Sequence, residues 1–289
     1  MIFSFRKILV FVIIFLALVF FGQLAFSYNS PIKEDFLVVN FLDVGQGDAI
    51  LINYQNKYQI LVDSGISNKN ILTELQKIMP AQDRSLEIVL ATHYDKDHVG
   101  GMRAVLENYK VKLFLDNGQF KDTEATTVVS DLIEKQKIEN YAIQENSKIR
   151  IGEDLLLDFF NPDGDDWDAN DNSIVFRMDF GVNSFLFTGD AGFKTEKDMM
   201  EDGHNLDVDY LKLAHHGSKN SSSEDFLEKV SPEKAFISVG KNSYGHPAEE
   251  ALERIKEIDS EILTTLDQGL IQLICQKNQA CSVNFFDKK

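Results

Sequence analysis

The segment "LEIVLATHYDKDHVGG", residues 86–101, decides the fold and points to a functional site. Residues 86–91 form a near-continuous apolar run, which predicts a strand that is buried on both faces. Two histidines and two aspartates follow within six residues: His93, Asp95, Asp97 and His98. Groups of this kind at a strand end repel one another or stay unsatisfied unless a cation joins them. The cluster therefore predicts a divalent-metal site, with two ions as the expected number; the alternative is a solvated loop of unrelated charges.

Strand and helix patterns alternate along the rest of the chain. In the first half we expect strands at residues 36–45, 48–54, 58–65, 86–93 and 111–117, and helices at residues 68–81, 99–110 and 125–138. In the second half we expect strands at residues 154–162, 173–180, 183–190, 208–216 and 234–240, and helices at residues 193–202, 221–231 and 246–258. A hairpin of residues 270–274 and 282–286 closes the chain.

The two halves share a layout. Residues 48–65 and residues 172–190 both contain a polar pair, a strand, a turn, a second strand and a glycine-containing loop with an aspartate. This repetition predicts a duplicated β-rich unit whose two sheets pack face to face with helices outside. The fold class is therefore α/β (α+β), a four-layer αββα sandwich in a single domain over residues 35–287.

Residues 1–30 have the pattern of a targeting segment. Arg6 and Lys7 precede an apolar run, residues 8–21, and residues 25–27 ("AFS") loosely match a small-x-small cleavage site. The pattern fits a cleaved signal peptide, or a single membrane anchor if it is not cleaved. Either one predicts that the remaining chain lies outside the cytoplasm.

Two cysteines occur near the C-terminus. Cys275 and Cys281 flank the turn of the expected hairpin, so a disulfide fits an oxidising compartment. Two free thiols are the alternative. Nothing in their spacing suggests a zinc site with cysteine ligands.

The composition is that of a globular protein with an acidic surface. The chain has 289 residues, of which 44% are hydrophobic and 26% charged, and its formal net charge is -17. This balance argues against a broad basic surface that follows a nucleic-acid backbone. It does not exclude a metal site that acts on phosphates, because bound cations outweigh the local field.

Seven sequence blocks resemble the metallo-β-lactamase superfamily, and most closely the hydrolase domain of the DNA-uptake (competence) protein ComEC and its stand-alone relatives. In chain order they are "FLDVGQGDAILI", "LVDSG", "THYDKDHVGG", "NDNSIVF", "FLFTGD", "LKLAHHGSKNSS" and "SVGKNSYGHP". The resemblance covers essentially everything after residue 35. It implies the metallo-β-lactamase form of the αββα sandwich.

The resemblance also implies a set of metal ligands. His93 and Asp95 would hold one ion, Asp97 and His98 the other, and Asp190 would bridge them. A histidine of "AHHGS" would complete the second site. Because side chains alternate along a strand, the two rings there should point in opposite directions, which favours His215 as the ligand and places His216 behind it.

Two departures from the superfamily pattern affect the metal. Asp95 stands where the second histidine is commoner, and a carboxylate shifts the preference toward manganese relative to zinc. No histidine lies between His98 and Asp190, so a third histidine ligand for the first ion is absent. Asp171, Asn172 or water would take its place.

Further residues are expected around the ions. The glycine loop and the "VDSG" block would orient ligands through Asp43, Gln46, Asp48 and Asp63. His246 would bind a substrate phosphate or protonate the leaving group, or it is only a loop residue before Pro247. The same two readings apply to Ser218 and Lys219, and Lys241 on the same loop as His246 is expected near the ligands or the substrate. As catalytic residues we expect Asp97, His246 and Lys219.

The expected chemistry is hydrolysis by two divalent cations, manganese or zinc, which activate water and clamp the reacting oxygens. The first hypothesis is an extracytoplasmic phosphodiesterase, a nuclease acting on DNA. The second is a hydrolase of a small substrate such as a phosphorylcholine-type ester, lactone, thioester or lactam. The third is an envelope accessory protein whose site has decayed. No protein partner can be inferred from the sequence.

Overall fold

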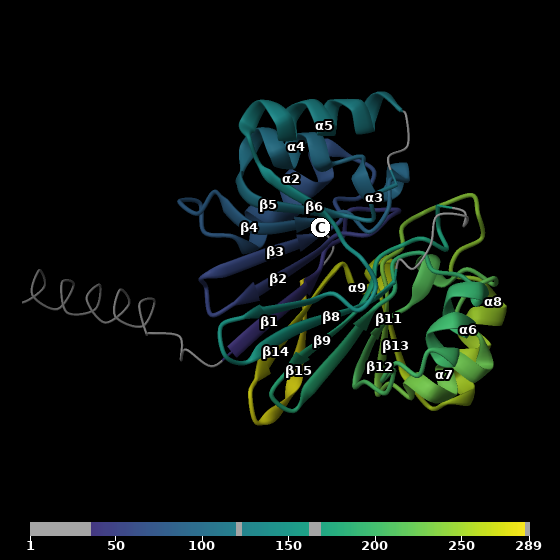
Figure 1. The fold of residues 1–289 in the computed structure, drawn as a ribbon. Coiled ribbons are helices and arrows are strands. Elements are labelled where there is room, and N and C mark those ends of the chain that lie inside the picture. The colour runs from purple at the N-terminus through teal and green to yellow at the C-terminus, as the bar shows by residue number, and fades with distance from the viewer. Residues whose placement is uncertain (1–35, 120–122, 162–168, 287–289) are drawn as a thin grey trace, which may run out of the picture. The chain divides into compact units, whose positions relative to one another are not determined.

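Two sheets packed face to face form the centre of the protein, as a computed structural model shows for residues 36–119, 123–161 and 169–286 (Figure 1). The first sheet consists, in spatial order, of β15 (Gln279–Phe286), β14 (Leu270–Gln276), β1 (Phe36–Phe41), β2 (Ile50–Tyr54), β3 (Tyr58–Val62), β4 (Ser85–Leu90), β5 (Lys110–Asp116) and β6 (Glu139–Ala142). The second consists of β13 (Glu261–Thr264), β12 (Lys234–Ile237), β11 (Tyr210–Lys212), β10 (Asn183–Phe187), β9 (Val175–Phe180), β8 (Leu155–Asn161) and β7 (Lys148–Ile151). The predicted leader, residues 1–30, lies outside the described residues.

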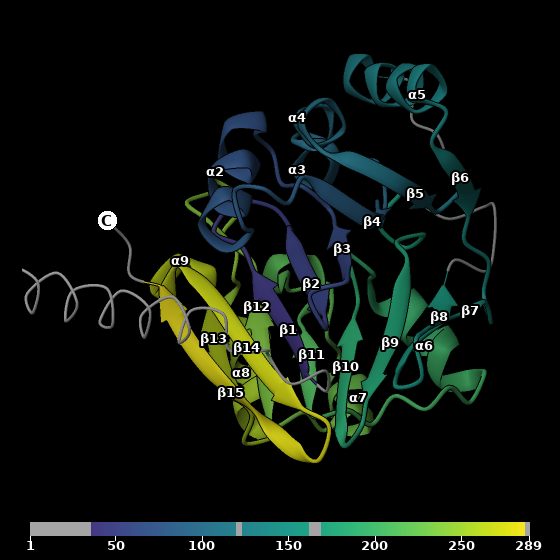
Figure 2. The same cartoon turned by 90° about the vertical axis from the view of Figure 1, so that its left-hand side faces the viewer.

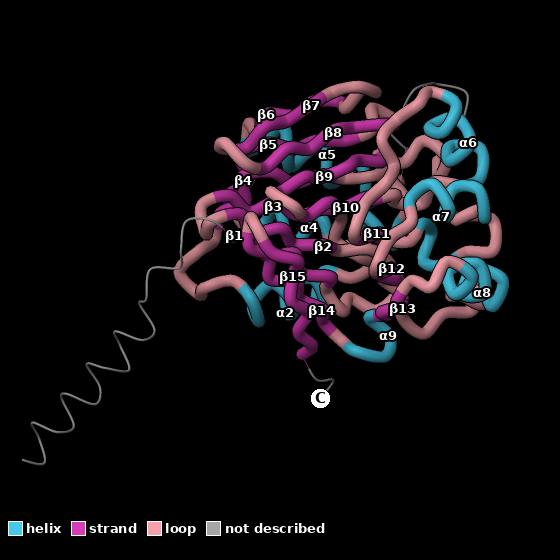
Figure 3. The backbone as a smooth tube through the Cα atoms, turned by 90° about the horizontal axis from the view of Figure 1, so that it is seen from below, coloured by secondary structure: helices cyan, strands magenta, loops and turns pink. Residues whose placement is uncertain are grey.

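Helices cover the outer face of each sheet. The first sheet is covered by α2 (Asn68–Ile78), α3 (Lys96–Val99), α4 (Met102–Asn108) and α5 (Glu124–Gln136). The second is covered by α6 (Phe193–Glu201), α7 (Glu224–Val230) and α8 (Glu249–Glu257), which lie together along one side of the molecule (Figure 3). Two short helices, η1 (Ala214–Gly217) and α9 (Thr265–Gln268), lie in connections. None of the described helices combines the length and apolar character needed to cross a membrane.

The strand pairing shows the duplication directly. In the first sheet β2 and β3 are antiparallel, and β3, β4, β5 and β6 then run parallel. In the second sheet β9 and β10 are antiparallel, and β10, β11, β12 and β13 then run parallel. The predicted αββα fold of two similar halves is confirmed. The C-terminal hairpin β14–β15 joins the first sheet beside β1 (Figure 2).

Three apolar clusters hold the four layers together. The central one lies between the sheets and is rich in phenylalanine, and its Phe41 and Phe236 rings stack at 4.5 Å between centroids. The second cluster joins the first sheet to α2, α4 and α5, and the third joins the second sheet to α6, α7 and α8. The central strands of each sheet therefore pack apolar side chains on both faces.

Some boundaries differ from the prediction. The expected helix 99–110 is interrupted at Gly100 and Gly101, which lie between α3 and α4. A Cβ atom on Gly100 would lie 2.4 Å from the Lys96 carbonyl oxygen, and a Cβ atom on Gly101 would lie 2.3 Å from the Ser64 carbonyl oxygen. The expected strand 208–216 ends at Lys212. Strands β6, β7 and β13 were not predicted.

The two cysteines form a disulfide within the C-terminal hairpin. Cys275 on β14 is bonded to Cys281 on β15, and both are buried against the central cluster. This confirms the bridge that the spacing suggested.

Candidate metal centre

The candidate site lies where the carboxyl ends of parallel strands from both sheets meet. The loop after β4 carries His93 and Asp95 and leads into α3, which carries Asp97 and His98. Asp190 follows β10. A pocket of about 150 Å³ opens there, lined by Gln46, Asp95, Asp97, Asp190, His215, His216, Tyr244 and His246. The loops that follow the strands at this one edge of the two sheets therefore supply all these groups.

Asp190 lies at the centre of the cluster. Its Oδ2 atom lies 3.2 Å from His98 Nε2, 3.6 Å from His216 Nε2 and 3.9 Å from His93 Nε2. The Asp97 carboxylate lies 3.3 Å from His216 Nε2. Each of these histidines is buried, and only 3% of Asp190 is exposed.

The Nδ1 atom of each buried ring is already engaged. His98 Nδ1 lies 2.7 Å from Asp63 Oδ2, and Asp63 also accepts bonds from Thr92. His216 Nδ1 lies 2.9 Å from the carbonyl oxygen of Ser238. His93 Nδ1 lies 3.2 Å from the Thr92 hydroxyl. These contacts orient all three Nε2 atoms toward the cluster, as contacts behind metal ligands do.

The atoms that face inward fit a bound cation. Among the described residues, His93 Nε2 and Asp190 Oδ1 are buried without a hydrogen-bond partner, and the buried His98 Nε2 and His216 Nε2 atoms have only carboxylates of the cluster beside them. Leaving such groups unpaired costs about 1–3 kcal/mol each. Two overlapping groups have atoms within 4.8 Å of one another: His93 with His98 and Asp190, and Asp97 with His98 and His216. Imidazole and carboxylate donors at these separations suit divalent metal.

Charge interactions divide the histidines into two kinds. Burial and the nearby His98 lower the pKa of His93 to about 3, so this ring is neutral and ready to coordinate. Burial acts to lower the pKa of His216, but the Asp190 and Asp48 carboxylates outweigh it and raise that pKa to about 9. Burial is likewise outweighed at His98, whose pKa Asp190 and Asp63 raise well above the ordinary value. Without metal, protons on the His98 and His216 rings balance the negative charge of the buried carboxylates.

The glycine loop "DVGQGD" packs against the metal-binding loop. The Asp48 amide donates to the Asp97 carbonyl at 3.2 Å. At Gly47 φ is +117°, and a Cβ atom would lie 2.0 Å from that same carbonyl oxygen. Only glycine allows this approach, so the loop sets the position of Asp97.

A buried lysine completes the support for His216. The Lys212 ammonium is 1% exposed and lies 2.7 Å from Asp48 Oδ2, while Asp48 Oδ1 lies 3.2 Å from His216 Nδ1. Burial acts to raise the pKa of Asp48, but Lys212 and His216 hold it below its ordinary value. Asp48 is therefore a buried carboxylate whose charge is balanced on both sides.

The expectation about the "AHHGS" histidines is wrong in its geometry. His215 and His216 both have positive φ, 50° and 53°, in η1, so strand alternation does not apply to them. Both rings face Asp190, with His215 Nε2 at 3.7 Å and His216 Nε2 at 3.6 Å. His216 is buried and belongs to the candidate ligand groups, whereas the side chain of His215 is 29% exposed at the pocket mouth.

Other predicted residues divide into those near the cluster and those elsewhere. The structure brings Gln46, Asp48, Asp63 and His246 to it. Asp43 and Lys241 line a neighbouring cavity, and Lys219 is exposed and does not line the metal pocket.

The remaining predicted residues have hydrogen bonds of their own or are buried. The Ser218 hydroxyl accepts from the Asn220 amide, and the Asp171 carboxylate accepts from the Gly192 amide. Asn172 Oδ1 is buried with no described partner, and its role as a replacement ligand stays a prediction.

Sequence reasoning missed Lys212, Thr92 and Ser173. A lysine within the apolar run "DYLKLA" was a usable signal, because an unpaired charge is not tolerated in a buried strand. Thr92 and Ser173 contact the His93 ring through their hydroxyls, and ordinary strand-end residues of this kind carry no such signal.

Comparisons with known proteins show the family. The family model described as Metallo-beta-lactamase superfamily matches residues 42–241. The chain is 28% identical to ComE operon protein 3 of Bacillus subtilis (strain 168) and 31% identical to Recombination protein 2 of Haemophilus influenzae. The alignments cover 81% and 87% of this chain but 32% and 29% of those proteins, so the chain spans about a third of their length. The resemblance stated from the sequence is confirmed.

Solved structures share the fold at low identity. Igni18, a metallo hydrolase from Ignicoccus hospitalis, has a TM-score of 0.55 and 13% identity, over 87% of this chain and 100% of its own. The diiron β-hydroxylase CmlA from Streptomyces venezuelae has a TM-score of 0.54 and 12% identity, over 86% of this chain and 55% of its own. At these identities the likeness shows the fold alone.

Metal binding should release protons. Below pH 9 the metal-free site holds a proton on His216, and a coordinated ring must be neutral, so affinity for Mn²⁺ or Zn²⁺ should rise with pH up to about 9. Isothermal titration calorimetry at pH 7 in buffers of different ionisation enthalpy measures the released protons. Binding without proton release would contradict the arrangement described above.

Replacing Lys212 by methionine should leave Asp48 buried and uncompensated. We expect the free energy of unfolding to fall by about 3 kcal/mol and metal affinity to fall roughly 10-fold, because His216 loses its support. Denaturant unfolding and metal titration measure both. Lys112→Met is the control, because that strand lysine is exposed and pairs with Glu87 at the surface. Equal effects of the two changes would show that Lys212 does not support the site.

Proposed function

The chain belongs to the metallo-β-lactamase superfamily, and from this premise we propose that it is an extracytoplasmic, metal-dependent phosphodiesterase that acts on DNA. The superfamily fold and the candidate ligand groups support a metal-dependent hydrolase. One observation carries the proposal: buried Nε2 atoms of three histidines converge on the buried carboxylate of Asp190. The choice of DNA is supported by the relatives, one of which is named Competence protein ComA, of Neisseria gonorrhoeae, at 28% identity over 85% of this chain and 33% of its own length.

Two divalent cations, manganese or zinc, would be held by overlapping sets of side chains. His93, Asp95 and Asp190 would hold one, and Asp97, His98, His216 and Asp190 the other. When bound, such a pair supplies Lewis acidity and an activated water. The carboxylates Asp95 and Asp97 favour a hard ion such as Mn²⁺ more than an all-histidine site would.

The chain's own residues around the mouth would bind and orient the substrate. His246 and Tyr244 line the pocket on the loop after β12, and their rings stack at 6.1 Å. Burial and the neighbouring His215 lower the pKa of His246, so its ring is neutral near pH 7 and can donate one hydrogen bond to a phosphoryl oxygen. Gln46 offers an amide on the opposite loop.

A small substrate is the second candidate. The metal pocket itself has only about 150 Å³, which suits a single ester or lactam group. The net charge of -17 also opposes the approach of a polyanion. Both candidates keep the same metal ligands and differ in the bond that is cleaved.

A substrate panel tests the proposal. Protein loaded with Mn²⁺ or Zn²⁺ should hydrolyse single-stranded DNA and bis-p-nitrophenyl phosphate but not nitrocefin, and a chelator should abolish the activity. Asp97→Ala should lower the rate by roughly 100-fold or more, because changes behind metal ligands alone cost 10–100-fold. Asp131→Ala, an exposed change on α5, is the control. Hydrolysis of nitrocefin alone would establish the second candidate instead.

We also propose that the domain works outside the cytoplasm, either secreted or held by residues 1–30. The Cys275–Cys281 disulfide supports this, since such bonds persist in oxidising compartments. In source cells, fractionation should find the domain outside the cytoplasm, and thiol alkylation without reductant should leave both cysteines unlabelled. Recovery in the cytosol with alkylated cysteines would overturn the proposal.

A further inference from the structure

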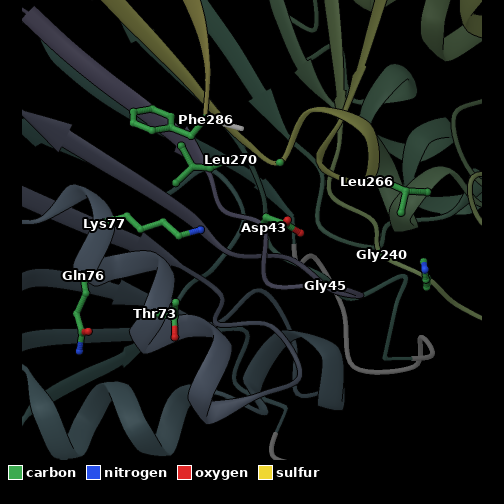
Figure 4. A pocket seen from close by; sticks show the side chains of 11 residues that line it. Asp43, Gly45, Thr73, Gln76, Lys77, Gly240, Leu266, Leu270 and Phe286 are labelled. Atoms are coloured by element: carbon green, nitrogen blue, oxygen red, sulfur yellow. The ribbon is translucent and has the colours of Figure 1, made fainter. Parts of the chain in front are cut away.

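A second, larger cavity lies beside the metal pocket (Figure 4). It has a volume of about 900 Å³ and is bounded by α2, the loop after β1, α9 and the adjoining ends of β14 and β15. Its size is in the range of cavities that hold a ligand of several hundred daltons. No residue of the candidate ligand groups lines it.

A single ridge of backbone separates the two cavities. Gly45 and Gly240 line the large cavity, while Gln46, the next residue after Gly45, lines the metal pocket. A Cβ atom on Gly240 would lie 2.4 Å from the Gly45 carbonyl carbon, so the two loops are in direct contact. A chain-like ligand that extended from the metal pocket past Gly45 and Gly240 would enter the large cavity.

The loop after β12 serves both sides of the ridge. Its Lys241 lines the large cavity, and its Tyr244 and His246 line the metal pocket. Asn242 holds the loop in place: its side chain donates to the Gly240 and His246 carbonyls and accepts from the Tyr244 amide. Because the loop is already held in one conformation, it presents groups to both cavities without an entropic cost of ordering on binding.

The lining of the large cavity combines cationic and apolar groups. Lys241 is exposed, and no described acidic group lies within ion-pair distance of its ammonium. Lys77 reaches into the cavity from α2 and is paired with Glu74 (Figure 4). Asp43 carries the opposing charge, while Leu270 and the half-exposed ring of Phe286 form an apolar wall. The cavity thus holds two lysines and an apolar wall, and the charges opposing the lysines are Asp43 and the Glu74 partner of Lys77.

We infer that the large cavity binds a nucleotide next to the scissile phosphodiester bond, an inference that rests on the proposed function. The base would stack on Phe286 and Leu270, and its phosphate would lie at Lys241 and Lys77. Aromatic stacking together with lysine contacts is how single strands are held without sequence preference. The same ridge then lets one strand occupy both cavities.

Two variants test this inference in the metal-loaded protein, Lys241→Glu and Phe286→Ala. Each should lower kcat/KM for a short single-stranded oligonucleotide roughly 10-fold, and lower that for bis-p-nitrophenyl phosphate much less, because the small ester does not reach the cavity. Each should also weaken binding of a fluorescein-labelled phosphorothioate oligonucleotide, measured by anisotropy. Lys197→Glu, the same charge change at an exposed position on α6, should leave all three measurements unchanged.

The outcomes separate this inference from the proposed function. Equal losses on both substrates, or oligonucleotide binding as tight as in the unmodified protein, would overturn the inference. If the unmodified protein hydrolysed neither phosphodiester, the proposed function would fail. Even in that case, oligonucleotide binding could still assign the cavity to a nucleotide strand. The required result is that Lys241→Glu weakens the binding and Lys197→Glu does not.

Discussion

The structure depends on one electrostatic constraint, the burial of Asp190 among imidazoles. A carboxylate cannot remain charged in a protein interior without compensation. Here the compensation comes from His98 and His216 at 3.2 and 3.6 Å, which hold the pKa of Asp190 well below its ordinary value although burial acts to raise it. Each ring is in turn held from behind, by Asp63 and by the Ser238 carbonyl. A cation and two protons are alternative ways to balance the same charges.

The duplicated fold is what brings these charges together. Each half ends its parallel strands at the same edge, and the ligands come from loops of both halves: His93 and His98 from the first, Asp190 and His216 from the second. Close backbone contacts lock these loops in place. Gly47 lies against the Asp97 carbonyl, and Gly240 lies against Gly45. The apolar layers fix the distance between the halves, and the glycine contacts fix the loops that extend beyond those layers.

Most of the fold and much of the site followed from the sequence because they rest on local patterns. Long apolar strands and the dense cluster from His93 to His98 are visible without tertiary information. The short exposed strand β6 carries no apolar alternation, since all four of its residues are exposed, so nothing in the pattern marked it as a strand. The orientation of His216 depends on two successive residues with positive φ, a conformation that strand periodicity cannot predict. Long-range partners such as the Ser238 carbonyl are set only when the sheets have formed.

The charge of the protein explains why recognition of a phosphodiester strand would have to be local. With a net charge of -17, the average field repels a polyanion, so long-range attraction cannot bring the strand to the site. Attraction must come from bound cations and from lysines close to the strand, because exposed charges farther away than about one Debye length, roughly 8 Å in physiological salt, are screened. Lys241 and Lys77 are candidates for this role, because both line the large cavity that adjoins the metal pocket. An acidic protein that held a strand only at the metal pocket would have little to offset that repulsion, so strand binding in the adjoining cavity is consistent with the proposed function.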